Sequence, residues 1–179
     1  MKPKRRVFII IDGSNFYFKL KELGFKDLLQ FNFSSLIRIL NSRNYQLTKV
    51  VYYIGKVKTS NNEKTKKLHA SQQQLFAYLR KHHIHYSLGY LLKTQGKFHE
   101  KGVDVNMAVD ILVNTYENLC DHFIILSSDT DLLPAIKKAR EKGKTIEYIG
   151  FSHQPSLAMI AKSNSSRLLT KEDLAVFFK

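Results

Sequence analysis

The sequence contains a single cysteine among its 179 residues, and this scarcity excludes two kinds of site. One cysteine forms no internal disulfide and supplies no cluster of thiolate metal ligands. Cys120 follows Leu119 at the expected end of a helix, where a small buried side chain is the ordinary role. The cysteine usage therefore suits a reducing, cytoplasmic setting.

Long apolar runs are also lacking. No stretch approaches the roughly 20 residues needed to span a bilayer, so we expect no membrane segment. The N-terminus is basic and then apolar, like a signal peptide, but Asp12 ends the apolar part too early. There is no internal repeat, low-complexity tract or linker, and the length suits one domain over residues 1–179.

Acidic residues are scarce: 15 Asp and Glu stand against 29 Lys and Arg, which gives a net charge of +14. Such an excess favours a polyanionic partner, with nucleic acid first and an anionic membrane surface second. Residues 56–101 contain ten basic and two acidic residues, a local excess of +8. We therefore expect nucleic acid to contact this part of the chain.

Apolar runs of strand length alternate with helical patterns along the chain. Residues 7–11 and 122–126 suit central strands that are buried on both faces. Further strands are expected over 50–54, 83–88, 145–150 and 167–169. The alternation predicts an α/β fold, a three-layer α/β/α sandwich with a mostly parallel, Rossmann-like central sheet, in which the strands over 7–11 and 122–126 are neighbours.

The strongest helical pattern covers residues 103–119. Apolar side chains recur on one face at a spacing of about 3.6, which predicts that this face packs on the core. These residues are Val105, Ala108, Val109, Leu112, Tyr116 and Leu119. The opposite polar stripe consists of Asn106, Asp110, Asn114 and Glu117. We expect Asp110 to face water or to bond a neighbouring segment.

Carboxylates stand at three of the expected element ends. Asp12 follows the strand over 7–11, and Asp104 begins the helix. Asp129 and Asp131 follow the strand over 122–126. Each acid has an ordinary interpretation as a helix cap or as a residue that the helix dipole favours. If the two strands flank the switch point of a doubly wound sheet, however, their carboxylates converge in one crevice.

Converging carboxylates predict a particular chemistry. They repel one another unless a proton or a cation neutralises them. An all-oxygen group suits Mg²⁺ or Mn²⁺ rather than zinc. In a basic protein this donor set points to phosphodiester hydrolysis, in which a metal lowers the pKa of the attacking water and holds the phosphate.

Three motifs resemble the NYN family, the LabA-like branch of the PIN-like nuclease superfamily. They are Asp12-Gly13-Ser14-Asn15, Lys101-Gly102-Val103-Asp104 and Ser127-Ser128-Asp129-Thr130-Asp131-Leu132. The resemblance covers nearly the whole chain and implies a metal-dependent ribonuclease on a Rossmann-like fold. One departure is Ser128, since the family often has glycine there, and serine requires a turn with negative φ or some strain.

The resemblance also assigns roles to individual residues. Asp12, Asp104 and Asp129 would be metal ligands. Asp131 would complete the acidic set, directly or through water, and Asn15 would orient a ligand or contact the phosphate. All five belong to the implied catalytic site.

Charge and aromatic content supply the candidates for RNA contact. For the phosphate backbone they are Lys56, Lys58, Lys64, Lys66, Lys67, Lys97 and Lys101. For stacking on single-stranded bases they are Tyr52, Tyr53, Tyr90 and Phe98. The ordinary alternatives are a solvated surface for the lysines and a place in the core for most of the aromatic residues. The oligomeric state is open, a homodimer included.

Other functions fit the sequence less well than a ribonuclease. A haloacid-dehalogenase phosphatase needs a nucleophilic Asp where this chain has Ile10, and no glycine-rich phosphate loop occurs. His83 and His85 could ligate a metal from one strand face, but no third ligand is near. The serious alternative is a non-catalytic module of the same fold that binds RNA or protein. Four carboxylates favour the enzyme, because in a binding module they would only repel RNA.

Overall fold

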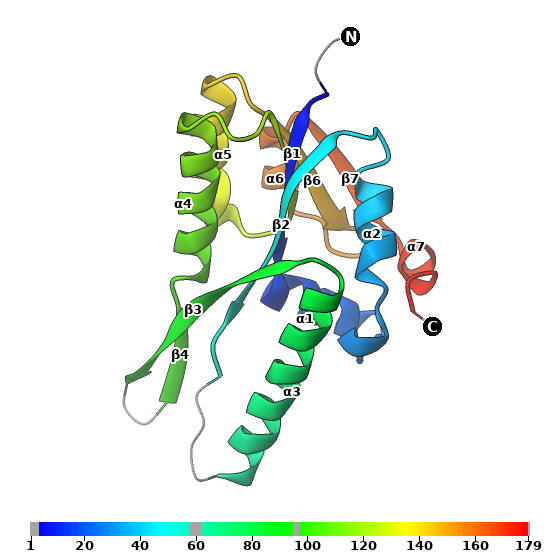
Figure 1. The fold of residues 1–179 in the computed structure, drawn as a ribbon, viewed down its shortest axis with the longest axis vertical. Coiled ribbons are helices and arrows are strands. Elements are labelled where there is room, and N and C mark those ends of the chain that lie inside the picture. The colour runs from blue at the N-terminus through cyan, green and yellow to red at the C-terminus, as the bar shows by residue number, and fades with distance from the viewer. Residues whose placement is uncertain (1–3, 58–61, 95–96, 179) are drawn as a thin grey trace.

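The computed structural model describes residues 4–57, 62–94 and 97–178, and for residues 91–100 the description is limited to the backbone. Its strands are β1 (Arg6–Asp12), β2 (Gln46–Gly55), β3 (His85–Thr94), β4 (Lys97–Lys101), β5 (His122–Leu126), β6 (Thr145–Phe151) and β7 (Ser165–Leu169). They form one sheet of order β4-β3-β2-β1-β5-β6-β7 (Figure 1). Only β3 and β4 pair antiparallel among these strands, so the predicted α/β fold with a mostly parallel sheet is confirmed.

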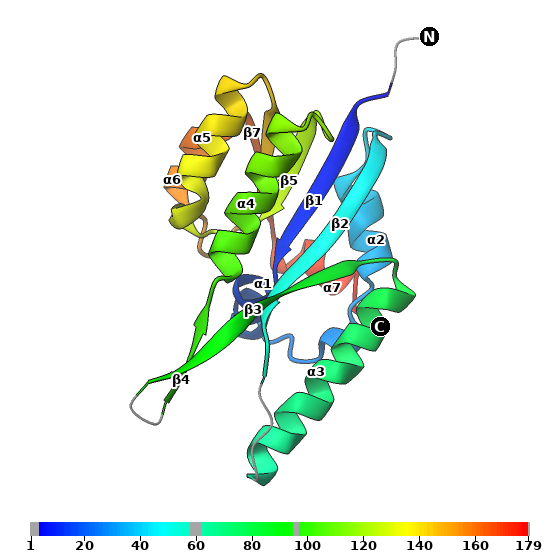
Figure 2. The same ribbon diagram turned by 60° about the vertical axis from the view of Figure 1, so that its left-hand side comes forward.

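Helices cover both faces of this sheet (Figure 2). One face carries α1 (Gly13–Glu22), α2 (Phe33–Leu40), α3 (Glu63–Lys81) and α7 (Lys171–Ala175). The other face carries α4 (Val103–Tyr116), α5 (Leu133–Glu141) and α6 (Leu157–Lys162). Two short 3₁₀ helices are η1 (Leu28–Gln30) and η2 (Thr130–Leu132). None of these described helices is long and apolar enough to cross a bilayer.

Strand β1 lies at the centre and supplies both hydrophobic layers. Val7, Ile9 and Ile11 belong to one core, and Phe8 and Ile10 belong to the other. All five are fully buried, as alternation along a strand with two covered faces requires.

The predicted pairing of β1 with β5 is confirmed, and it defines the switch point of the sheet. The two strands pair in parallel, with Val7 opposite His122 and Ile11 opposite Leu126. From β1 the chain continues to β2 on one side, whereas β5 lies on the other. The carboxyl ends of β1 and β5 therefore meet at the crevice where α/β proteins bind their ligands.

Helix α4 is rotated relative to the prediction. Val105, Val109 and Tyr116 were expected in the core but are 62%, 49% and 59% exposed. Met107 and Ile111 are fully buried in their place. Of the predicted apolar face, Ala108 and Leu112 are half-buried, and Leu119 is exposed. The prediction for this face was wrong.

Hydrogen bonds of its polar side chains, two to neighbouring strands and one within the helix, explain the rotation of α4. Asp110 accepts a hydrogen bond from the hydroxyl of Tyr53 on β2. Asn106 donates its amide to the carbonyl of Leu88 on β3 at 3.3 Å. Asn114 is buried and donates to the Asp110 carbonyl at 2.7 Å. Because these side chains are paired, facing the sheet leaves no buried polar group unsatisfied.

The strand predicted over 83–88 starts later than expected. His83 has φ 56°, a left-handed conformation at the turn after α3, and β3 begins at His85. The two histidines therefore do not share a strand face, and the predicted pairing of their side chains was wrong.

Candidate metal centre

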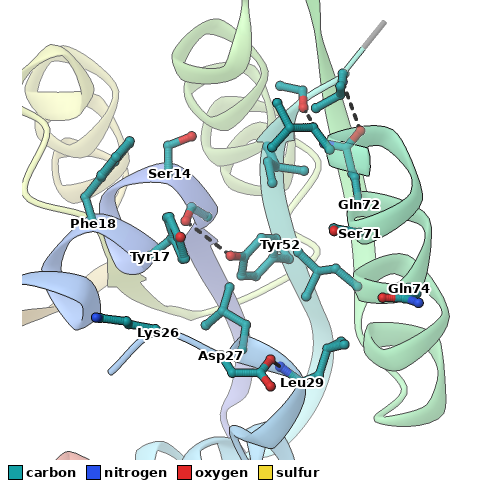
Figure 3. Close-up of a pocket in the computed structure, with 17 residues that line it drawn as sticks. Ser14, Tyr17, Phe18, Lys26, Asp27, Leu29, Tyr52, Ser71, Gln72 and Gln74 are labelled. Atoms are coloured by element: carbon teal, nitrogen blue, oxygen red, sulfur yellow. Dashed lines mark hydrogen bonds between the residues drawn. The ribbon is translucent and has the colours of Figure 1, made fainter. Parts of the chain in front are cut away.

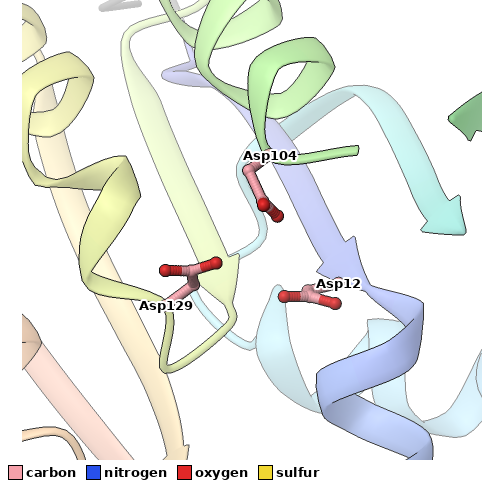
Figure 4. A group of neighbouring side chains, drawn as sticks. All are labelled: Asp12, Asp104 and Asp129. Carbon is pink, nitrogen blue, oxygen red and sulfur yellow. The ribbon is translucent and has the colours of Figure 1, made fainter. Parts of the chain in front are cut away.

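Three predicted site carboxylates converge at the switch point (Figure 4). Asp12 ends β1, Asp104 lies in the first turn of α4, and Asp129 follows β5 as the N-cap of η2. One carboxylate oxygen from each residue lies within 4.8 Å of the others. We call these three residues the carboxylate group.

Asp12 is the most firmly held member of the group. It is 5% exposed and serves as the N-cap of α1. Its Oδ1 accepts a hydrogen bond from the Asn15 backbone N–H at 3.0 Å. Its Oδ2 accepts one from the Ser127 hydroxyl at 2.8 Å. These two bonds fix the carboxylate plane toward the crevice.

Ser127 links two members of the group. While its hydroxyl donates to Asp12, its Oγ accepts a hydrogen bond from the Asp129 backbone N–H at 3.1 Å. Asp129 in turn accepts at Oδ1 from the Asp131 N–H at 2.9 Å. The role of Ser127 was not predicted, although it stands inside the motif that carries Asp129.

Gly102 gives α4 its start and so places Asp104. It is the N-cap of α4 with φ 84°, a conformation that favours glycine. A Cβ there would lie 2.7 Å from a ring carbon of Tyr90. Both the backbone conformation and the ring therefore select glycine two residues before the carboxylate.

Two members of the group, Asp12 and Asp129, have no basic partner among the described residues. Burial, followed by the nearby negative charge of Asp129, raises the pKa of Asp12. Residues 103–136 contain six acids and no Lys or Arg. Three converging carboxylates, which offer oxygen ligands alone, fit a hard divalent ion.

Asn15 has a partner within the protein. Its Oδ1 accepts a hydrogen bond from the Ser128 backbone N–H at 3.4 Å, which ties the loop after β5 to α1. Ser128 is not among the described residues with positive φ, so serine fits this turn without left-handed strain. Its hydroxyl bonds the Tyr148 hydroxyl at 2.9 Å. Contact of Asn15 with a phosphate stays a prediction.

Asp131 lies outside the carboxylate group. Its side chain is exposed, and its backbone N–H is the part that contacts Asp129. A contribution of Asp131 to a metal through water stays a prediction.

Two of the predicted stacking residues are in the core. Tyr52 and Tyr53 are both fully buried, so their assignment to RNA contact was wrong. The Tyr52 hydroxyl donates to the Gly13 carbonyl at 3.1 Å, and the Tyr53 hydroxyl donates to Asp110. Because both hydroxyls have acceptors, the two tyrosines can be buried on a central strand. The acceptors are remote in sequence, so the burial was not predictable from local pattern. Tyr90 is 58% exposed and stays a candidate, while the Phe98 side chain lies outside the described part.

Most of the predicted phosphate-binding lysines are accessible. Lys56, Lys64, Lys66, Lys67 and Lys101 are exposed. Helix α3 and the β3–β4 hairpin, which carry four of them, extend beyond the carboxyl edge of the sheet (Figure 2). Lys58 lies outside the described residues, as does the side chain of Lys97.

A cleft of about 650 Å³ opens between α1 and α3 (Figure 3). Its lining includes Gly13 and Ser14, which directly follow Asp12, and continues along α1, the segment at η1, the end of β2 and α3. The cleft was not predicted. Its walls come from four separate parts of the chain, so no local sequence pattern signals it.

The fold and the acidic switch point define the class, an α/β/α protein with a carboxylate group where the strand order reverses. The family model described as NYN domain matches residues 6–170. The chain therefore belongs to the NYN domain family. Among curated proteins, none matches this chain.

Solved structures support the fold. A protein of unknown function from Vibrio parahaemolyticus, VPA0982, has a TM-score of 0.70 at 17% identity, with 94% of this chain and 95% of that chain covered. A putative UDP-N-acetylglucosamine 2-epimerase from Listeria monocytogenes aligns over 97% of this chain and 42% of its own, at 12% identity. Its TM-score of 0.48 is too low to carry an argument.

Proposed function

We propose that this protein is a divalent-metal-dependent ribonuclease that cleaves phosphodiester bonds of single-stranded RNA at the carboxylate group. The observation that carries the proposal is the convergence of Asp12, Asp104 and Asp129 within 4.8 Å at the switch point. Membership of the NYN domain family supports it, because the resemblance implies a PIN-like nuclease.

The three carboxylates would hold Mg²⁺ or Mn²⁺. A divalent ion bound there supplies Lewis acidity at the phosphate and lowers the pKa of the attacking water. The chain's own residues keep the ligands in place. Ser127 orients Asp12 through its hydroxyl, and Asn15 holds the loop that bears Asp129. Such supporting hydrogen bonds fix ligand geometry.

The distribution of charge supports RNA as the partner. Residues 103–136 lack Lys and Arg, whereas residues 56–101 contain ten. RNA would therefore approach over α3 and the β3–β4 hairpin, with exposed lysines such as Lys64 and Lys67 contacting phosphates without reading sequence. The cytoplasmic setting and the LabA-like branch belong to the same proposal and rest on the cysteine usage and the three motifs.

The decisive experiment compares Asp129→Asn with Asp131→Asn in cleavage of single-stranded RNA with Mn²⁺. Asn keeps the size of Asp but loses the charge that holds the cation. We expect Asp129→Asn to reduce cleavage by about 100-fold or more, because the Lewis acid contributes several kcal/mol. The matched comparison, Asp131→Asn, should lose much less than Asp129→Asn, since Asp131 lies outside the group and could reach the metal only through water.

RNA binding separates loss of chemistry from loss of substrate. Without metal, Asp129→Asn should bind RNA as well as wild type or slightly better, because a negative charge has left the site. Persistent cleavage by highly purified Asp129→Asn protein would contradict the proposal. A wild type that binds RNA but never cuts it with Mn²⁺ would instead support a non-catalytic module.

A further inference from the structure

The cleft between α1 and α3 has the size of a ligand site. Its volume of about 650 Å³ falls within the range of sites that bind small organic groups. Ser14 lies at one end and α3 forms the opposite wall (Figure 3). Gly13 and Ser14 line the cleft and directly follow Asp12, so the cleft begins at the residue after a member of the carboxylate group.

The cleft is lined largely by apolar side chains, and three of its lining residues are aromatic: Tyr17, Phe18 and the buried Tyr52. Tyr17 and Phe18 of α1 line it with ring centroids 5.6 Å apart at an interplanar angle of 61°. Phe18 is 58% exposed and Leu68, on the α3 side, is 50% exposed. Phe18 and Leu68 are therefore large apolar side chains that no other part of the described structure covers. Unstacked bases pack against aromatic faces such as that of Phe18.

Charge in the cleft nearly cancels. Lys26 and Asp27 are its charged lining residues, one of each sign. Asp27 is already engaged, since its carboxylate accepts from the Leu29 N–H at 2.9 Å and from the Gln30 amide at 3.1 Å. A cleft of this composition does not attract a phosphate. It fits an uncharged group with a flat apolar face.

Polar groups in the cleft divide into two sets. Gln72 shapes the wall, because its amide donates to the Gly55 carbonyl at 2.7 Å and its Oε1 accepts from the Val57 N–H at 2.9 Å. Ser71 and Gln74, both exposed on α3, line the cleft as well. A hydroxyl and an amide supply donors and acceptors for the edge of a heterocycle.

We propose that this cleft is a nucleobase subsite, which takes one unpaired base of the RNA strand whose phosphate lies at the carboxylate group. The inference rests on the proposed function and deepens it by naming the substrate class. A base inside a duplex is stacked and paired, so only a strand with an unpaired nucleotide next to the cleavage point places a base here.

The test uses protein that carries Asp129→Asn, without metal, so that binding is measured without cleavage. Phe18→Ala removes an aromatic wall of the cleft. Tyr116→Ala is the matched control, because Tyr116 is an equally exposed aromatic residue on α4, at 59%. For a short single-stranded RNA oligonucleotide, Phe18→Ala should weaken binding about tenfold, whereas Tyr116→Ala should leave it unchanged.

An abasic scan identifies the base. The same oligonucleotide is made with one abasic nucleotide at each position in turn, and the loss caused by Phe18→Ala is measured for every version. At the one position whose base occupies the cleft, Phe18→Ala should cause no further loss. A loss that is equal at all positions, or equal for Phe18→Ala and Tyr116→Ala, overturns the subsite.

Metal-dependent cleavage is measured separately in wild-type protein, which retains Asp129, and this measurement distinguishes the two proposals. If wild type cleaves RNA but the loss caused by Phe18→Ala is the same at every abasic position, the subsite proposal is contradicted and the ribonuclease proposal stands. If the loss caused by Phe18→Ala disappears at one abasic position but wild type never cleaves RNA, the ribonuclease proposal is contradicted and the cleft remains a base-binding site. RNA that does not bind at all overturns the subsite.

Discussion

Carboxylates lie at both ends of the β1–β5 pair, and their surroundings differ between the two ends. At the amino end, Arg6 donates to Asp121 from Nε at 3.1 Å and from a terminal nitrogen at 2.7 Å. This pairing lowers the pKa of Asp121 to about 2. At the carboxyl end, Asp12 and Asp129 have no such partner among the described residues, and burial raises the pKa of Asp12.

The difference supports the carboxyl end as the cation site of the proposed function. A carboxylate that holds the fold together is neutralised by the fold itself, as Asp121 is by Arg6. Asp12 is held in place by neutral donors, the Ser127 hydroxyl and the Asn15 N–H, which orient the carboxylate and leave its charge in place. Because its donors are neutral, the Asp12 carboxylate remains available to bind a cation from solution.

Outside the carboxylate group itself, the largest expected effect comes from removing the hydrogen-bonded link between Asp12 and Asp129. Ser127→Ala deletes the donor to Asp12 and the acceptor for the Asp129 N–H. We expect Mn²⁺ affinity and cleavage to fall by about 10- to 100-fold, the usual loss when a supporting bond to a ligand is removed.

Ser128→Ala is the matched control in the same loop, because its hydroxyl bonds Tyr148 rather than a carboxylate. Mn²⁺ titration and cleavage rates compare the two variants. Equal losses in both would show that Ser127 has no special part in the site.

A smaller effect concerns the stability of the metal-free protein. The raised pKa of Asp12 means that its charged form is disfavoured in the folded state. Its stabilising contribution is therefore present below the unfolded pKa and is lost as pH rises through the folded pKa. Asp12→Asn should raise the free energy of unfolding at neutral pH by about 1 kcal/mol and flatten this decline.

Denaturant unfolding in the presence of a chelator, repeated across pH, measures this change. Destabilisation of the metal-free protein by Asp12→Asn at neutral pH would contradict the difference between the two ends. That result is the one expected for a carboxylate with a basic partner, such as Asp121.

The smallest effect belongs to the paired end. Because Arg6 lowers the pKa of Asp121 to about 2, this carboxylate stabilises the fold above its ordinary pKa of 3.8. That contribution is lost as pH falls from there through about 2. The side chains are 33% and 36% exposed, so solvent screens the pair and the effect is small.

Asp121→Asn should remove this part of the acid dependence without changing Mn²⁺ binding. Unfolding curves between neutral and acid pH, with and without the substitution, provide the measurement. An unchanged acid limb would mean that the ion pair contributes nothing to folding.

Local patterns were enough to predict the central sheet and the carboxylates. The runs over 7–11 and 122–126 are apolar throughout because both faces of β1 and β5 are covered, and each run ends at a polar turn. That a strand ends in Asp12 is visible in the sequence. The partnership of Asp12 with Ser127 across the switch point is not, since it depends on the pairing of β1 with β5.

The orientation of α4 shows where such patterns fail. The helix has apolar residues on two faces, one with Val105 and Val109 and the other with Met107 and Ile111. Hydrophobic spacing alone does not choose between them. The choice follows from acceptors and donors on other strands, Tyr53 and the Leu88 carbonyl, which satisfy the polar residues between.

The most direct test of the central claim is Mn²⁺ binding to RNA-free protein by titration calorimetry, with wild type, Asp129→Asn and Asp131→Asn measured side by side. We predict saturable binding in wild type, affinity weakened about 100-fold or more in Asp129→Asn, which exceeds the usual loss for a supporting residue, and a much smaller loss in Asp131→Asn. Equal binding in Asp129→Asn and wild type, or a wild type without saturable binding, would contradict the account.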